Sequence, residues 1–162
     1  MKHDLSPEGQ HLLARYADRG WFDAAGDDRL REANSYSAVR LTHPAYLVLA
    51  SGMQVIPSSE VQITSRCNYR PFRGRCLVVT PQTAKRFELL DLKVLHHSQF
   101  RRGDALPLHD CVKEAMPELI RWPLDVCGAS VEISIRAIIP ANAAIENDPG
   151  TPLEMLLIGE VL

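Results

Sequence analysis

Alternation of apolar and polar residues is clearest over residues 130–139 of the chain. The apolar residues fall at every second position, as Val131, Ile133, Ile135, Ala137 and Ile139. Polar or charged residues fill the positions between, as Ser130, Glu132, Ser134 and Arg136. Because successive side chains of a strand point to opposite faces, this pattern predicts a strand with one buried and one solvent-facing side.

Further short apolar segments follow from residue 46 onward, and turn-forming residues separate them. The strands predicted from these segments span residues 46–50, 60–66, 75–80, 86–96 and 154–162. The turns between strands are predicted at Pro57-Ser58-Ser59, Pro81-Gln82-Thr83, Arg102-Gly103-Asp104 and Asn147-Asp148-Pro149-Gly150. Residues 110–116 are expected to form one or two helical turns, because Pro117 would end a longer helix. The pattern predicts a mainly β domain over residues 34–162, built as an antiparallel β-sandwich.

The N-terminal region has a different pattern. Ser6-Pro7-Glu8 has the composition of a helix start, with a capping serine, a proline at the first helical position and an acid in the first turn. Apolar residues recur at helical spacing up to Ala17, Gly20 is a plausible stop, and a second short helix is expected over about residues 21–33. We interpret residues 1–33 as a helical arm, in which Tyr16, Trp21 and Phe22 anchor a neighbouring subunit or cover one end of the sandwich.

Composition agrees with a single folding unit. The chain has 162 residues, of which 46% are hydrophobic and 23% are charged, as in ordinary globular domains. Four cysteines without a C-x-x-C spacing favour a reducing compartment. Because we find neither a secretory leader nor an apolar run that could span a membrane, we expect cytoplasmic synthesis, with later release in a virion left open.

Charge is unevenly distributed along the chain. Residues 1–33 carry five Lys/Arg and seven Asp/Glu, residues 34–105 carry ten and four, and residues 106–162 carry three and nine. The basic middle and the acidic C-terminal part could neutralise each other within the fold, which we favour. They could also meet head to tail between copies, or the basic part could bind an anion.

The most basic segment spans residues 65–76 and contains no acidic residue. Its four arginines and two aromatic residues are Arg66, Arg70, Arg73, Arg75, Tyr69 and Phe72. Arginine binds phosphate or carboxylate through two parallel hydrogen bonds, and aromatic rings stack on bases. We consider these six residues candidate contacts for nucleic acid, for another anion or for a subunit interface. The alternative is a loop whose arginines pair with the acidic C-terminal part of the same molecule or of a neighbour.

A metal-dependent β-barrel enzyme is a further alternative. His96, His97, His109 and Cys111 are residue types that bind zinc. If His96 and His97 continue the strand that begins at residue 86, however, their side chains point to opposite faces and cannot both reach one ion. Catalysis by Cys111 would need a nearby base that the sequence does not show. The chain also lacks a G-x-S-x-G motif and a glycine-rich phosphate loop. We therefore predict no catalytic residue, metal or cofactor.

Three short stretches carry a resemblance to a known class of protein. They are Pro71-Phe72-Arg73-Gly74-Arg75-Cys76-Leu77-Val78-Val79, Asp91-Leu92-Lys93-Val94 and Ser98-Gln99-Phe100. Over about residues 55–162, including the final Leu156-Leu157-Ile158-Gly159, the chain resembles small jelly-roll-like structural proteins of virions, meaning coat or capsid-associated proteins. The resemblance implies self-assembly into a shell, or attachment to one. It also implies that the partners are further copies of the chain or other structural proteins, and that function resides in interfaces.

Overall fold

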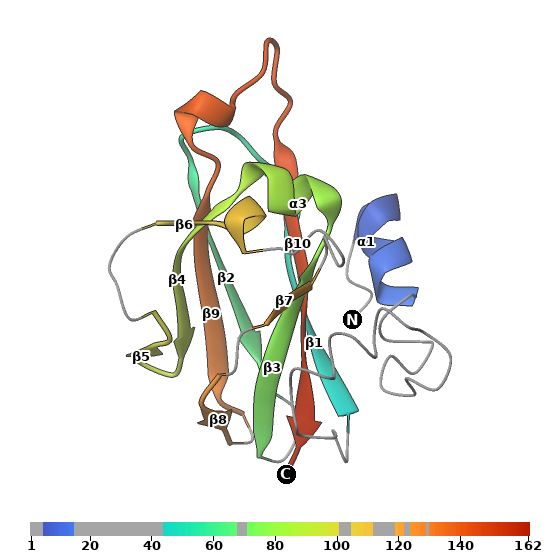
Figure 1. Ribbon diagram of the computed structural model, residues 1–162, viewed down its shortest axis with the longest axis vertical. Helices are drawn as coiled ribbons and strands as arrows, with labels where there is room; N and C mark the ends of the chain where they lie inside the picture. Colours follow the sequence, from blue (N-terminus) through green and yellow to red (C-terminus); the bar gives the residue numbers. More distant parts are fainter. Residues whose placement is uncertain are drawn as a thin grey trace.

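The computed structural model describes residues 5–14, 44–67, 71–100, 105–111, 119–121, 124–128 and 130–162. These residues form two antiparallel β-sheets and a short N-terminal helix (Figure 1). The prediction of a mainly β chain that begins with a helix is confirmed.

The first sheet, here called sheet A, has its strands in the order β1-β10-β3-β7, and the short strand β8 also pairs with β3. Its strands are β1 (Pro44–Val55), β10 (Thr151–Val161), β3 (Phe72–Val79), β7 (Leu119–Arg121) and β8 (Val126–Cys127). Pro44 pairs with Glu160, so segments far apart in the sequence lie side by side.

The second sheet, here called sheet B, has the order β2-β9-β4-β5, and the short strand β6 also pairs with β4. Its strands are β2 (Glu60–Arg66), β9 (Glu132–Ile138), β4 (Glu88–Val94), β5 (His97–Ser98) and β6 (Leu106–Pro107). The four described strand pairs of this sheet, β2–β9, β4–β9, β4–β5 and β4–β6, are all antiparallel. The sheet therefore continues through β9 and β4, and β2 lies at one end of it.

A single hydrophobic core joins the two sheets. Sheet A contributes Leu49, Leu77, Leu153 and Leu157, and sheet B contributes Ile63, Leu89, Leu92, Ile133 and Ile135. In β9 the predicted alternation is confirmed, since Ile133, Ile135 and Ala137 are buried while Glu132 and Arg136 are exposed.

Strand β10 is buried on both faces. Leu153, Met155 and Leu157 belong to the shared core, and the alternate residues Leu156 and Ile158 are also buried, on the outer face of sheet A. The same outer face holds two buried carboxylates, Glu154 and Glu160. A strand that is covered on both faces is almost continuously apolar in sequence. Because an unpaired charge is costly to bury, Glu154 and Glu160 each need a hydrogen-bonding partner.

Two α-helices lie against sheet A. Helix α1 (Pro7–Leu13) begins where predicted, because the Ser6 side chain accepts a hydrogen bond from the Gly9 N–H and Pro7 occupies the first helical position. Leu5 and Leu12 are buried, and α1 contacts β10. The described part of the N-terminal arm therefore packs on its own molecule. Tyr16, Trp21, Phe22 and the predicted second helix lie outside the described residues.

Helix α3 (Pro81–Arg86) corrects two predictions. Residues 81–83 were expected to form a turn and residue 86 to begin a strand, but Thr80 caps a helix through the Thr83 N–H, and β4 starts only at Glu88. Two 3-10 turns complete the described structure, η3 (Leu108–Asp110) and η4 (Ala141–Ala143). The predicted helical turns at 110–116 lie mostly outside the described residues. None of the described helices has the length and apolar character needed to cross a bilayer.

Candidate interaction surface

The basic segment lies between the end of β2 and the first half of β3. Arg66 is the last residue of β2, Phe72 is the first of β3, and Arg73 and Arg75 follow on β3. Tyr69 and Arg70 lie outside the described residues. Phe72 is fully buried in the core that joins the sheets, so its ring is not open to a ligand. Phe72, one of the two aromatic residues predicted to contact a ligand, is therefore part of the hydrophobic core.

Two of the arginines form ion pairs with carboxylates from the acidic C-terminal part. Arg75 donates to Glu160 on β10, with Nε at 3.0 Å from Oε1, and Glu160 is almost fully buried. Arg66 lies 3.4 Å from Glu132 on β9, where both side chains are exposed. Arg73 is half-buried and has no ion pair with a described residue. These contacts agree with our favoured interpretation that the two oppositely charged parts neutralise each other within one molecule.

The residue types that could bind a metal are not brought together. His96 and His97 lie at the turn between β4 and β5, where Val94 pairs with His97. His109 and Cys111 lie beside η3, at the opposite end of β4, where Glu88 pairs with Pro107. The seven residues of β4 separate the two ends by about 20 Å. His109 is instead 3.0 Å from Asp110, and no group of three metal-ligating side chains occurs among the described residues.

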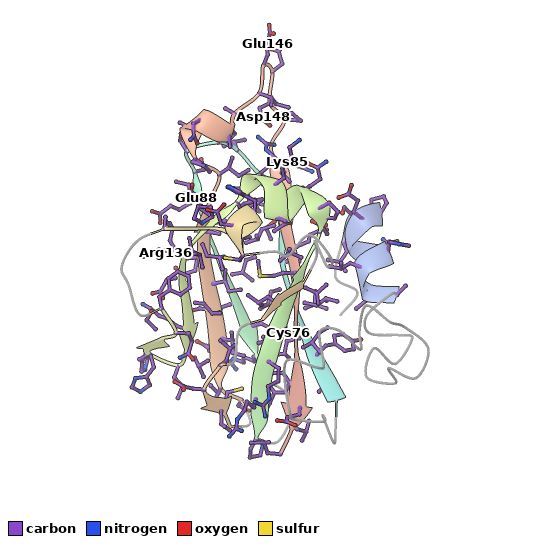
Figure 2. The ribbon with its side chains drawn as sticks, in the orientation of Figure 1. Cys76, Lys85, Glu88, Arg136, Glu146 and Asp148 are labelled. Carbon is purple, nitrogen blue, oxygen red and sulfur yellow. The ribbon has the colours of Figure 1, made fainter. Side chains whose placement is uncertain are left out.

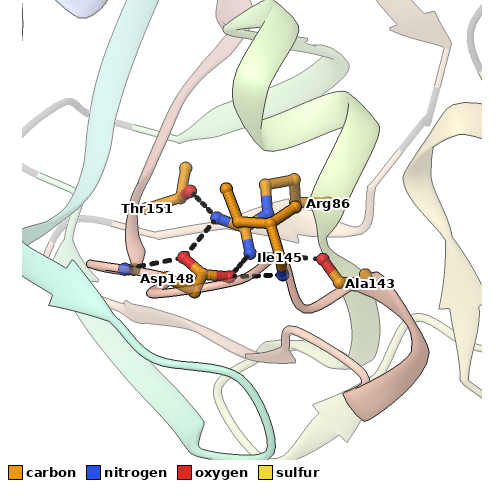
Figure 3. Close-up of polar contacts among 6 residues, drawn as sticks. Arg86, Ala143, Ile145, Asp148 and Thr151 are labelled. Atoms are coloured by element: carbon orange, nitrogen blue, oxygen red, sulfur yellow. Dashed lines mark hydrogen bonds and ion pairs between the residues drawn. The ribbon is translucent and has the colours of Figure 1, made fainter.

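A buried ion pair holds the β9–β10 loop against α3 (Figure 3). Arg86, the last residue of α3, pairs with Asp148 through both of its terminal nitrogens. It also donates to Thr151 Oγ1 at 2.5 Å and to the Ala143 carbonyl at 3.3 Å. Only 9% and 6% of the Arg86 and Asp148 side chains are exposed. Arg86 Nε is buried and has no hydrogen-bond partner among the described residues.

Asp148 organises its own loop as well. Its carboxylate accepts hydrogen bonds from the N–H groups of Ile145, at 3.3 Å, and Gly150, at 2.9 Å. The hydrogen bond from Arg86, together with these backbone donors, lowers the pKa of Asp148 to about 2. Figure 2 shows Glu146 further out than Asp148 at the tip of this loop. The predicted turn at Asn147-Asp148-Pro149-Gly150 therefore fixes the base of a projecting loop.

A second buried carboxylate anchors helix α1. Glu154 on β10 is 2% exposed and accepts from the Ser6 N–H and the Ser6 hydroxyl, each at 2.5 Å. The backbone of Gly9 passes so close that an added Cβ would lie 2.8 Å from this carboxyl group. Ser6 therefore has two roles, because it caps helix α1 and also attaches the helix to β10 through Glu154.

Two buried thiols meet where β8 and the end of β2 approach each other. Cys127 on β8 and Cys67, which follows β2, are linked by a side-chain hydrogen bond. Burial, reinforced by this contact, raises the pKa of Cys127 to about 12. Neither cysteine forms a disulfide with a described residue. At neutral pH the Cys127 thiol is protonated, which fits a structural role.

Large apolar side chains are exposed at both ends of the sheets. Met53 lies near the end of β1, Ile56 on the β1–β2 connection and Ile145 on the β9–β10 loop. Leu95, Val126 and Leu162 lie near the β4–β5 turn, on β8 and after β10. Ser58 N–H donates to the Ile139 carbonyl at 2.8 Å, which joins the β1–β2 turn to the end of β9. The described surface therefore offers apolar contacts at its ends.

No known protein family, curated protein or solved structure matches this chain.

Proposed function

We propose that this protein is a structural subunit of a self-assembling shell, such as a virion, and that its fold is a jelly roll. The observation that carries the proposal is the nested pairing of the strands. The outermost pair is β1 with β10, followed inward by β2 with β9, β3 with β7 and β4 with β5.

The nested pairs alternate between the two sheets. The β1–β10 and β3–β7 pairs belong to sheet A, and the β2–β9 and β4–β5 pairs belong to sheet B (Figure 1). A long antiparallel hairpin that is rolled up gives this arrangement, which is the construction of an eight-stranded jelly roll. Viral capsid domains, lectins and cupins use this fold, so the fold alone leaves several functions open.

The chemistry of the described residues favours a structural function among these. The buried charged groups Arg86, Asp148, Glu154 and Glu160 are engaged by partners in the same molecule. Arg66 and Arg75, two of the four arginines that could bind nucleic acid, are paired with carboxylates. Exposed apolar side chains at the sheet ends provide surfaces that copies of the chain could bury against one another.

Measuring the size of the purified full chain tests the proposal. We expect size-exclusion chromatography with light scattering to show discrete oligomers, and negative-stain electron microscopy to show rings or shells. A chain that stays monomeric over a wide range of concentration and salt would contradict the proposal.

A further inference from the structure

Strand β2 is an edge strand in the described part of sheet B. Among the described residues it pairs with β9 alone, over an unbroken register from Glu60 opposite Ile138 to Arg66 opposite Glu132. Its sequence, Glu-Val-Gln-Ile-Thr-Ser-Arg, contains neither proline nor glycine. Edge strands of this length and regularity usually carry a bulge, a proline or a covering segment, because their free backbone groups invite pairing.

The direction of the backbone groups at this edge follows from two hydrogen bonds of β9. The Val131 carbonyl accepts from the Cys67 N–H, on the β2 side, and the Glu132 carbonyl accepts from the Leu95 N–H, on the β4 side. Backbone groups alternate in direction along a strand, so Ile135 faces β2 and forms a hydrogen-bonded pair with Ile63. The N–H and C=O groups of Glu60, Gln62, Thr64 and Arg66 consequently point to the free edge.

We propose that β2 pairs antiparallel with β2 of a second copy, about a two-fold axis at Ile63, so that two copies of sheet B form one continuous sheet. In this register Gln62 faces Thr64 of the second copy, and Glu60 faces Arg66 of the second copy. The inference rests on the proposed assembly function and names the surface and the partner through which assembly begins.

Charge complementarity selects a second copy as the partner. Because the two copies of β2 run in opposite directions, Glu60 of one copy faces Arg66 of the other at both ends of the pairing. Opposite charges directly across two strands attract. The same residues already belong to exposed ion pairs with β9, since Arg66 lies 3.4 Å from Glu132 and Glu60 lies 3.7 Å from Arg136.

These pairs line up across the proposed axis. From one copy to the other, the row reads Glu132, Arg66, then Glu60 and Arg136 of the second copy, with the sign alternating at each step. Figure 2 labels Arg136 on β9, and the four side chains are between 49% and 70% exposed. An isologous interface repeats the row on both sides of its axis, as two-fold symmetry requires.

Two single charge reversals and their mixture test the pairing. In Glu60→Lys, a new lysine faces Arg66 of the second copy, and in Arg66→Glu, a new glutamate faces Glu60 of the second copy. Each variant alone should associate about tenfold more weakly than the unaltered protein, because two attractive pairs become repulsive. A mixture of the two variants should recover association, because every facing pair is then opposite in sign.

Sedimentation velocity gives the association constants, and native mass spectrometry identifies the mixed oligomer by mass. Lys93→Glu is the matched control, because Lys93 lies on β4, which is paired on both sides, and its side chain is 43% exposed. This control should associate like the unaltered protein. Circular dichroism and the melting temperature of each variant establish that it is folded.

The outcomes separate this inference from the proposed function. Association through β2 is overturned, while the assembly function stands, if both reversals assemble like the unaltered protein. The two-fold register is overturned if both are folded and weakened but their mixture does not recover. An unaltered protein that stays monomeric overturns the assembly function and this inference together. The pairing is supported only if both variants are weakened and their mixture recovers association.

Discussion

Asp148 shows how one carboxylate can hold a long connection in place. It lies 62 residues after Arg86 in the chain, yet it receives both terminal nitrogens of that side chain and two backbone N–H groups of its own loop. Arg86 in turn reaches Ala143 and Thr151, on either side of Asp148. The Arg86–Asp148 ion pair therefore links both sides of the projecting β9–β10 loop to helix α3.

Replacing Asp148 with asparagine should destabilise the fold. The change removes the charge that compensates the buried Arg86 guanidinium, so we expect the melting temperature to fall by roughly 5–10 °C. Glu132→Gln is the matched control, because it removes the acid of the exposed Arg66 pair and should change the melting temperature very little. Equal shifts in the two variants would contradict a special role for the buried pair.

Acid should remove the contribution of Asp148 in a defined pH range. The folded pKa of Asp148, about 2, lies below its ordinary value of 3.8, so the ionised form favours the folded state. The contribution is complete above about pH 4 and is lost as the pH falls through 2. Urea unfolding of the unaltered protein and Asp148→Asn at several pH values should show their stability difference shrinking over this range. A difference that does not change with pH would contradict the assignment.

At the scale of elements, a bulge allows β3 and β10 to stay paired. The register shifts between Ile158 and Gly159, so Cys76 faces Ile158 while Gly74 faces Gly159. A Cβ on Gly159 would overlap the Arg73 carbonyl oxygen and lie 2.8 Å from the Phe72 ring. Glycine is therefore required at this crossing of the two strands.

Gly159→Ala should cost about 3 kcal/mol or more of unfolding free energy, because neither the backbone of β3 nor the buried Phe72 ring can give way easily. Gly52→Ala provides the comparison. Gly52 has φ of 67° and nothing within 4 Å of an added Cβ, so only backbone strain of about 1–2 kcal/mol is expected there. Chemical denaturation measures both, and a smaller loss for Gly159→Ala would contradict this account of the bulge.

Helix α1 depends on Ser6 for both its start and its docking. Ser6→Ala removes the cap on the Gly9 N–H and the hydroxyl bond to Glu154. We expect a loss of about 1–3 kcal/mol in chemical denaturation. Ser98→Ala, which removes an exposed hydroxyl bonded to Asp91, should cost much less. An unchanged stability in Ser6→Ala would show that α1 is held by Leu5 and Leu12 alone.

Sequence patterns predicted the elements whose signals are local. The strict alternation in β9 and the Ser6-Pro7 helix start were sufficient on their own. Thr80-Pro81 carries the same signal as Ser6-Pro7, but α3 has only six residues and no apolar period to extend it, so its sequence alone resembles that of a turn. Strands β5, β6 and β8 have two residues each and cannot display a period.

The roles that depended on distant partners could not be predicted. Arg86, Glu154 and Glu160 were charged residues within or beside predicted strands, and their burial depends on Asp148, Ser6 and Arg75. The sequence offered pairing of the basic segment with the acidic C-terminal part as one alternative, but it could not assign Glu132 to Arg66 or Glu160 to Arg75. The nested order of the strands is likewise a property of the folded chain and not of any segment.

At the scale of the whole molecule, one core serves two sheets while the outer face of sheet A carries a second buried layer. Helix α1 covers part of that layer, whereas the outer face of sheet B carries exposed polar side chains such as Glu132 and Arg136. Among the described residues, the surfaces left open are therefore the outer face of sheet B, the sheet ends and the edge strand β2, whose free backbone groups are available for pairing.

The nested pairing also constrains when the chain can fold during translation. The innermost pair, β4 with β5, can form soon after it leaves the ribosome, whereas β1 must wait for β10, more than ninety residues later. Until then the apolar side of β1 has no strand beside it, and the nascent chain is at its most vulnerable to aggregation. A chain with this strand pairing completes its fold late, and protection from aggregation matters most while β10 is still being synthesised.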